Sequence, residues 1–165
     1  MARRHDGALS FQVVSVDPRG PDAQRLLAEL TAEITDIYAD LGYDGTGGFA
    51  LADLDGSRAV FVVAYADGEP VGCGALRPYQ EDIAEVKRMY TVPAWRGRGI
   101  AAAILAELER HGRVFGYPTM RLETGDRQPG AIRLYERSGY RHIPPFGPYV
   151  AWSDSVCFEK PLALD

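Results

Sequence analysis

The sequence predicts an α+β protein with layered α/β architecture, in which helices cover the faces of a mixed sheet. Two observations support this fold class. Apolar runs of strand length are interrupted by segments whose apolar residues recur at helical spacing. Three of the strand-like runs follow one another, and an Asp-Gly pair between the first two is a strong hairpin signal. With 165 residues and 46% hydrophobic content, we expect one domain over 10–165 after a flexible tail over 1–9.

The N-terminal part of the chain predicts one strand, one helix and a long loop. Apolar residues over 11–16 predict the strand, and the breaker cluster over 17–21 ends it. A helix is expected from Asp22 to the stop at Gly42, because apolar residues recur at helical spacing: Leu27, Leu30, Ile34, Ile37, Tyr38 and Leu41. The segment 43–56, rich in glycine and aspartate, predicts a long loop of the kind that often carries function.

The rest of the chain predicts five strands and two helices. The strands are expected over 59–66, 70–76, 83–92, 119–124 and 155–159. One helix follows the glycine-rich turn before Ala101, and the other opens at Pro129 and stops at Gly139. Strict alternation along the strand over 83–92 places Val86, Arg88, Tyr90 and Val92 on one face and Lys87, Met89 and Thr91 on the other.

Charge and cysteine content narrow the class of protein. The formal net charge of −5 argues against a nucleic-acid partner and fits either steering of a cationic amine or solubility alone. Cys73 and Cys157 lie in apolar stretches, which predicts buried free thiols in a reducing cytoplasm and no metal site. No apolar run approaches the ~20 residues of a membrane span, and none follows the N-terminal arginines as in a signal peptide. We therefore expect a cytoplasmic protein without a membrane partner.

A glycine-rich turn between a strand and a helix is the first feature that points to a ligand. The turn Arg96-Gly97-Arg98-Gly99-Ile100-Ala101 combines small residues, a helix N-terminus and two arginines, all of which favour a phosphate group. A Walker-type loop is excluded, because no Gly-Lys-Ser/Thr ends the turn. A dinucleotide fold is disfavoured, because its glycines follow the first strand of a parallel sheet and Ala102 replaces the third glycine. Taken alone, the turn also fits an ordinary strand-to-helix connection.

Three blocks of sequence together resemble the GNAT superfamily of N-acetyltransferases. The turn fits the pattern Arg/Gln-x-x-Gly-x-Gly/Ala of the acetyl-CoA site in that family. The segment 84–92 resembles the central strand of the family, with Glu85 eleven residues before Arg96, and 134–140 resembles its closing helix-and-strand signature. The blocks span about residues 58 to 142. The resemblance implies a mostly antiparallel central sheet whose central strand splays to hold CoA, with acetyl-CoA as co-substrate.

The resemblance also assigns residues to the acetyl-CoA site. It implies that the backbone N–H of Met89, at a bulge of the central strand, donates to the thioester oxygen, and that Thr91 pairs with the pantetheine arm. Gln128 stands where many members have asparagine, so it keeps an amide. The implied cofactor-binding residues are Met89, Tyr90, Thr91, Arg96, Gly97, Arg98, Gly99, Ile100, Ala101, Gln128 and Tyr135.

Acetylation of an amine needs a base to neutralise the amine and an acid for the departing thiolate. By resemblance Tyr135 is the acid, although its place on an apolar helix face also fits a packing role. Glu85 is the base in some family members and only supports the strand in many others, so Glu123 and Tyr79 are kept as reserve candidates. His111 and His142 are expected at the surface or at strand ends, away from catalysis.

Aromatic and charged residues in loops and strands predict the acceptor pocket. Arg88 is expected either to bind an acidic group of the acceptor or to form a salt bridge inside the fold. The stiff, aromatic run over 144–149 is expected to shape the pocket. The candidate acceptor-binding residues are Tyr38, Phe49, Tyr79, Arg88, Glu123, Phe146 and Tyr149.

The predicted function is transfer of an acetyl group from acetyl-CoA to a primary amine of a small molecule or an amino-acid-like acceptor. Two alternatives stay open at this point. One is a protein acetyltransferase acting on lysine or an N-terminus, and the other is a non-catalytic acyl-CoA-binding module. The partners expected are a small-molecule amine and, by resemblance to the family, a second copy of the chain in a homodimer.

Overall fold

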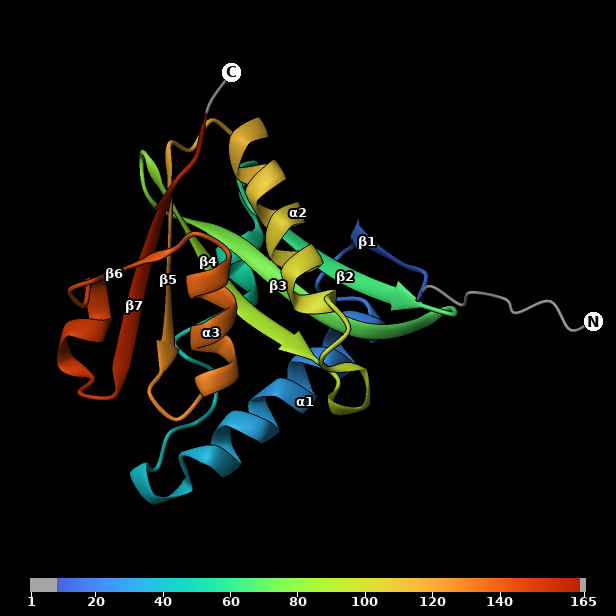
Figure 1. The fold of residues 1–165 in the computed structure, drawn as a ribbon, viewed down its shortest axis with the longest axis horizontal. Helices are drawn as coiled ribbons and strands as arrows, with labels where there is room; N and C mark the ends of the chain where they lie inside the picture. The colour runs from blue at the N-terminus through green and yellow to red at the C-terminus, as the bar shows by residue number, and fades with distance from the viewer. Residues whose placement is uncertain (1–8, 164–165) are drawn as a thin grey trace, which may run out of the picture.

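The computed structural model describes residues 9–163, which form a seven-stranded mixed sheet with helices on both faces (Figure 1). The strands lie in the order β1-β2-β3-β4-β5-β7-β6, and only the central pair β4–β5 is parallel. The strands are β1 Phe11–Ser15, β2 Val60–Ala66, β3 Glu69–Gln80, β4 Ile83–Thr91, β5 Thr119–Gly125, β6 Arg141–Ile143 and β7 Ser155–Pro161. The helices are α1 Pro21–Ile37, α2 Ile100–Val114 and α3 Pro129–Arg137. The predicted mixed, mostly antiparallel sheet is confirmed.

Two apolar layers hold the helices to the sheet. Side chains alternate between the faces of a strand, and on β2 Val62 and Ala64 join the core beneath α2 and α3. Phe61 and Val63 face the other way and pack with buried residues of α1. Figure 1 shows α2 and α3 in front of the sheet, with α1 crossing below them. The site described below lies where these elements meet the end of β4.

The first helix ends earlier than its apolar pattern predicts. We expected the helix to run to Gly42, but α1 ends at Ile37 and a 3-10 turn follows over Ala39–Leu41. The tighter turn redirects the chain, so that Tyr38 is buried while Leu41 is 44% exposed. Gly42 then adopts φ +70°, a left-handed conformation that ends the turn.

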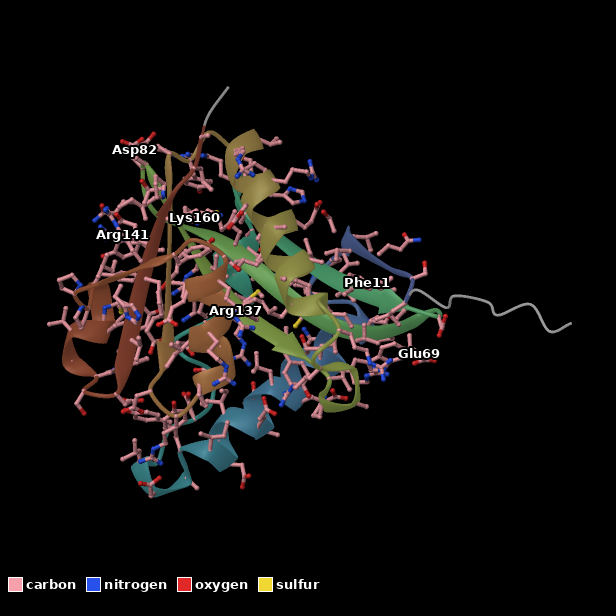
Figure 2. All side chains as sticks on the ribbon, viewed as in Figure 1. Phe11, Glu69, Asp82, Arg137, Arg141 and Lys160 are labelled. Carbon is pink, nitrogen blue, oxygen red and sulfur yellow. The ribbon has the colours of Figure 1, made fainter. Side chains whose placement is uncertain are left out.

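The hairpins and the C-terminal segment differ from the prediction in length. The second strand of the meander was expected to end at residue 76, but β3 continues to Gln80 because it pairs with β4 past Pro78. Figure 2 shows Glu69 and Asp82, at the two hairpin tips, at opposite ends of the sheet. The strand β6 was not predicted, since three residues are too few to show a periodic pattern.

A bulge in β4 changes which face its side chains occupy. Cys73 pairs with Tyr90 and Ala75 with Lys87, so two residues of β4, Arg88 and Met89, oppose the single residue Gly74. Arg88 has φ +57°, which is uncommon for a residue with a side chain. The extra residue breaks strict alternation. Val86 and Met89 both pack in the α2 layer, whereas Tyr90 packs in the α1 layer. The predicted grouping of Val86 with Tyr90 on one face is therefore wrong.

The parallel pair separates after four residue pairs. Pairing between β4 and β5 runs from Ile83 with Thr119 to Val86 with Leu122. Both strands continue beyond this point, and Figure 1 shows their ends pointing apart, with α3 in front of the place where they diverge. The splayed central strand implied by the family resemblance is thus present.

A half-buried ion pair fixes the end of α3 to α2 and β7. Lys160 of β7 donates to both carboxylate oxygens of Glu109 in α2, at 3.0 and 3.1 Å, and to the carbonyl of Ser138 just after α3, at 2.8 Å.

Cys73 and Cys157 are buried free thiols, as predicted. Among residues 9–163 no helix is long and apolar enough to cross a membrane, and no group of side chains could hold a metal ion.

Candidate active site

A cavity of about 470 Å³ lies where β4 and β5 diverge. The end of α1 and the loop over 42–48 form one wall, β4 and β5 form the floor, and α3 with the segment 152–154 closes the other side. The lining side chains with chemistry to offer are Tyr38, Tyr43, Asp44, Lys87, Arg88, Glu123, Gln128, Tyr135 and Asp154. Met89, at the bulge, also lines it.

Glu123 presents a carboxyl group to the cavity from the end of β5. The hydroxyl of Ser155, its neighbour across the β5–β7 pair, donates to Glu123 Oε1 at 3.0 Å. Burial raises the pKa of the Glu123 carboxyl above its usual value, and the nearby ammonium group of Lys87 only partly offsets this effect. The carboxyl is therefore shifted in the direction that a base working near neutral pH requires.

Tyr135 lines the cavity from α3, within reach of the split between the strands. Its ring is buried and packs against Tyr140 and Phe158, with ring centroids 6.1 and 5.7 Å away. Burial raises the pKa of the Tyr135 hydroxyl far above its usual value, so the hydroxyl stays protonated at neutral pH. A protonated hydroxyl in a cavity can act as a proton donor.

Lys87 is a buried cation that the sequence analysis did not single out. Its ammonium group donates to the carbonyl of Gly47 and to the hydroxyl of Tyr149, each at 2.8 Å. Burial lowers the pKa of Lys87, while the Glu85 carboxylate opposes that shift. A lysine in the middle of a strand expected at the centre of the sheet is the signal that could have identified it, because lysine is almost never fully buried unless paired. Lys87 fixes the loop over 42–48 against the sheet.

Glu85 lies outside the cavity and both of its carboxylate oxygens are occupied. It is 1% exposed, Arg77 Nε donates to Oε1 at 2.8 Å, and the Tyr149 hydroxyl donates to Oε2 at 2.6 Å. Arg77 also pairs with Asp53. The network that contains Glu85 therefore links β3, β4 and the C-terminal segment behind the cavity floor.

The aromatic candidates divide into two groups. Tyr38 lines the cavity, next to Tyr43 and Trp152. The four others do not line it. Phe49 borders a separate, smaller pocket, whereas Tyr79 and Phe146 pack edge to face with centroids 5.1 Å apart in a cluster with the buried Tyr149. The run over 144–149 thus packs behind the site and does not line the cavity.

The predicted phosphate turn lies beyond the end of β4 and leads into α2. Gly97 and Gly99 have φ +75° and +82°, and added side chains there would meet only open space. No side chain of residues 9–163 caps the start of α2, and its first turn contains no acidic residue. The first N–H groups of a helix have no partner within the helix, so this end of α2 suits an anion.

The two arginines of the phosphate turn have different roles. Arg96 donates through Nε to the carbonyl of Thr91 at 2.9 Å and pairs with Glu33 of α1 at 2.6 Å. Arg98 is exposed, and its guanidinium lies 4.9 Å from the ring centroid of Trp95. Arg96 thus fixes the turn to β4 and α1, whereas Arg98 is available to a ligand.

The remaining cofactor candidates flank the open edge of β4. Tyr90 packs in the α1 layer, its hydroxyl donates to Glu29 at 3.3 Å, and burial raises the pKa of this hydroxyl to about 12. Thr91 is buried at the end of the strand. Gln128 lines the cavity just before α3. The side chain of Tyr90 therefore packs in the core and does not line the cavity.

The split sheet and the uncapped turn indicate an acyl-CoA-dependent acyltransferase. Comparison with known families gives the same class. The model of the Acetyltransferase (GNAT) family matches residues 23–140. A protein named IAA acetyltransferase from Azospirillum brasilense is 41% identical over 103 residues, which cover 62% of this chain and 67% of that protein. The chain belongs to the GNAT family and is an N-acetyltransferase.

Solved structures and a second relative agree with this family. A Klebsiella pneumoniae protein assigned as an acyl-CoA N-acyltransferase has a TM-score of 0.77 and 32% identity, covering 93% of this chain and 98% of that one. A GNAT acetyltransferase from Elizabethkingia anophelis, solved with acetyl-CoA bound, shares the fold with a TM-score of 0.65 and 17% identity, covering 92% and 98%. Human N-acetylaspartate synthetase is 36% identical over 91 residues, or 54% of this chain and 30% of that protein.

Proposed function

We propose that this chain transfers the acetyl group of acetyl-CoA directly to the primary amine of a small, amino-acid-like acceptor. The observation that carries the proposal is the cavity at the split, where Glu123, Tyr135 and Met89 line one volume. About 470 Å³ lies in the usual range of small-molecule sites. The names of two relatives, IAA acetyltransferase and N-acetylaspartate synthetase, support a small acceptor.

The chain has residues that fit each part of acetyl-CoA. The uncapped first turn of α2, with Gly97 and Gly99 beside it, suits the pyrophosphate, and Arg98 adds an exposed cation. The edge of β4 from Met89 to Thr91 has no partner on its β5 side, which leaves it for the pantetheine arm. When bound, acetyl-CoA supplies the acetyl thioester. The chain supplies the groups that orient the acceptor and move protons.

We assign the general base to Glu123. A lysine-like amine has a pKa of about 10.4, so a base must remove its proton directly or through one water. Glu123 lines the cavity and has a raised pKa, which makes its carboxylate a stronger base. Glu85 is the weaker candidate, because Arg77 and Tyr149 occupy its carboxylate behind the cavity floor.

Two further groups act on the thioester end of the reaction. The N–H of Met89, at the bulge that removes it from regular pairing, donates to the oxygen on which negative charge develops. The hydroxyl of Tyr135 donates its proton to the departing sulfur. Both groups border the same cavity as Glu123.

An amine screen tests the proposed function. The purified protein is mixed with acetyl-CoA and a library of primary amines, with a lysine-containing peptide among them, and free thiol is followed. We expect turnover with one or more small amines and little with the peptide. Turnover confined to the peptide would support a protein acceptor, and tight CoA binding without any turnover would support a non-catalytic module.

A further inference from the structure

Arg88 lines the cavity, and no carboxylate of residues 9–163 is hydrogen-bonded to its guanidinium. Its guanidinium donates to Gly45 O at 2.8 Å, to Thr31 Oγ1 at 2.6 Å and to Leu27 O at 3.3 Å, all of them neutral acceptors. Its Nε is buried and has no hydrogen-bond partner among residues 9–163. Arg88 also lines the smaller pocket that Phe49 borders, together with Leu27 and Thr31. Within the described part of the chain, the guanidinium therefore lies between the two pockets, without a hydrogen-bonded anion and with one N–H that has no acceptor.

Arg77, on the neighbouring strand β3, has a largely buried guanidinium as well, but this one is paired with carboxylates. Its side chain is 16% exposed and meets two carboxylates, those of Glu85 and Asp53. Buried charges are normally paired in this way, because an unpaired charge loses its hydration without compensation. The acid nearest to Arg88 in the loop, Asp44, is bonded instead to the N–H and hydroxyl of Thr46, at 2.9 and 2.8 Å. Asp44 lies near enough to attract Arg88 but makes no hydrogen bond to it, so the guanidinium can still pair with the carboxylate of a ligand.

We propose that the acceptor carries a carboxylate close to its amine and that Arg88 binds this carboxylate. The inference rests on the proposed function, since it concerns the acceptor of that reaction. A planar guanidinium binds a carboxylate through two parallel hydrogen bonds, which gives direction as well as affinity. The three hydrogen bonds that Arg88 makes inside the chain leave N–H groups of its guanidinium unused, and an N–H that borders the cavity can donate to the carboxylate of the acceptor.

The bulge places this cation beside the reacting centre. Arg88 immediately precedes Met89, whose N–H we assign to the thioester oxygen, and its φ of +57° turns its side chain away from the regular pattern of the strand. The amine must approach the carbonyl carbon next to that oxygen. The acceptor's carboxylate is then only a few bonds from its amine, as in an α- or β-amino acid.

Charges on the opposite wall match the other end of such an acceptor. The cavity holds the carboxyl groups of Glu123 and Asp154 as well as the cation of Arg88. A zwitterion can place its ammonium group toward the acids and its carboxylate toward the arginine. A zwitterion has no net charge, so the net charge of −5 neither attracts nor repels it at long range, and selection of the carboxylate depends on this local cation.

The test compares each amino acid with its carboxamide. The enzyme is assayed with acetyl-CoA and pairs of α- and β-amino acids and their amides, and the ratio of kcat/KM for acid over amide is compared between variants. Comparing this ratio between proteins cancels the difference in amine pKa within each pair. We expect Arg88→Gln to lower the ratio about 100-fold, because loss of one partner of a buried charge pair is costly. Arg88→Lys should restore part of it.

Arg58→Gln is the matched control. Arg58 also donates only to backbone carbonyls, those of Phe115 and Glu81 at 3.1 Å each, but it does not line the cavity. We expect the ratio to stay within about 2-fold of wild type in this variant. An equal loss for acids and amides in Arg88→Gln would overturn the inference, because it would show that Arg88 only anchors the loop.

A binding measurement separates this inference from the proposed function. Calorimetry with CoA present compares N-acetyl amino acids with their amides. If no amine is acetylated but the acids bind more tightly than the amides in an Arg88-dependent manner, the proposed function fails and the carboxylate site stands. If amines are acetylated with no preference for acids, the proposed function stands and the inference fails.

Discussion

The hydroxyl of Tyr149 joins two buried charges, and removing it should destabilise the protein measurably. It accepts from the Lys87 ammonium at 2.8 Å and donates to the Glu85 carboxylate at 2.6 Å. A hydrogen bond to a charged group contributes about 1.5–3 kcal/mol, so Tyr149→Phe should cost about 3–6 kcal/mol. For a chain of this size each kcal/mol lowers Tm by about 2–4 °C, which gives a drop of roughly 6–24 °C.

Thermal unfolding at neutral pH measures this effect, with Tyr65→Phe as the control. The Tyr65 hydroxyl donates to Asp22 at 2.7 Å at a half-exposed position, so that variant should lose about 1 kcal/mol or less. A Tm for Tyr149→Phe within about 2 °C of wild type would refute the reasoning. It would mean that water or a rearranged partner replaces both hydrogen bonds.

Three further predictions concern the reaction itself. Tyr135→Phe should lower kcat by about 10²- to 10⁴-fold with little change in CoA affinity, measured by steady-state kinetics and calorimetry; an unchanged kcat would remove the acid assignment. Gly99→Asp should abolish CoA binding in calorimetry, because it places a carboxylate at the phosphate turn, whereas Gly116→Asp, at the other end of α2, should leave it intact. The rate of acetyl transfer should rise with pH as Glu123 loses its proton. Because burial raises the pKa of this carboxyl, the inflection should lie above 4.5, the usual value for glutamate, and Glu123→Gln should remove it from the pH profile.

The fold could be predicted from the sequence because the main elements carry their own periodic signals. The apolar runs marked β2, β4, β5 and β7 nearly to the residue, and Pro129 and Gly139 bracket α3. The end of α1 was missed, because Ile37 to Leu41 keep helical spacing while the chain tightens into a 3-10 turn. The sequence also assigned the residues of β4 after Lys87 to the wrong face of the sheet, because one inserted residue at the bulge shifts the alternation of side chains.

The site was predictable only where a residue's neighbours lie close in the chain. Tyr135, which lies in the closing block, and Gln128, which stands where many family members have asparagine, both line the cavity, and so does Glu123. Glu85 and Tyr149 bind each other across 64 residues of sequence, and no local pattern shows that this contact withdraws both from the cavity. The carbonyls of Gly47 and Gly45, to which Lys87 and Arg88 donate, lie 40 and 43 residues away in sequence, so the roles of both residues emerged only from the folded chain.

The short parallel pairing has a consequence for local stability. In the described residues β4 and β5 form the only ladder between the β1–β4 part of the sheet and the β5-β7-β6 part, and that ladder is confined to four residue pairs. Local opening needs least free energy where few backbone hydrogen bonds and contacts must break. We expect amide hydrogen exchange to be fastest, among the central strands, in the ends of β4 and β5 beyond Val86 and Leu122, so that the sheet opens along this seam before either part unfolds.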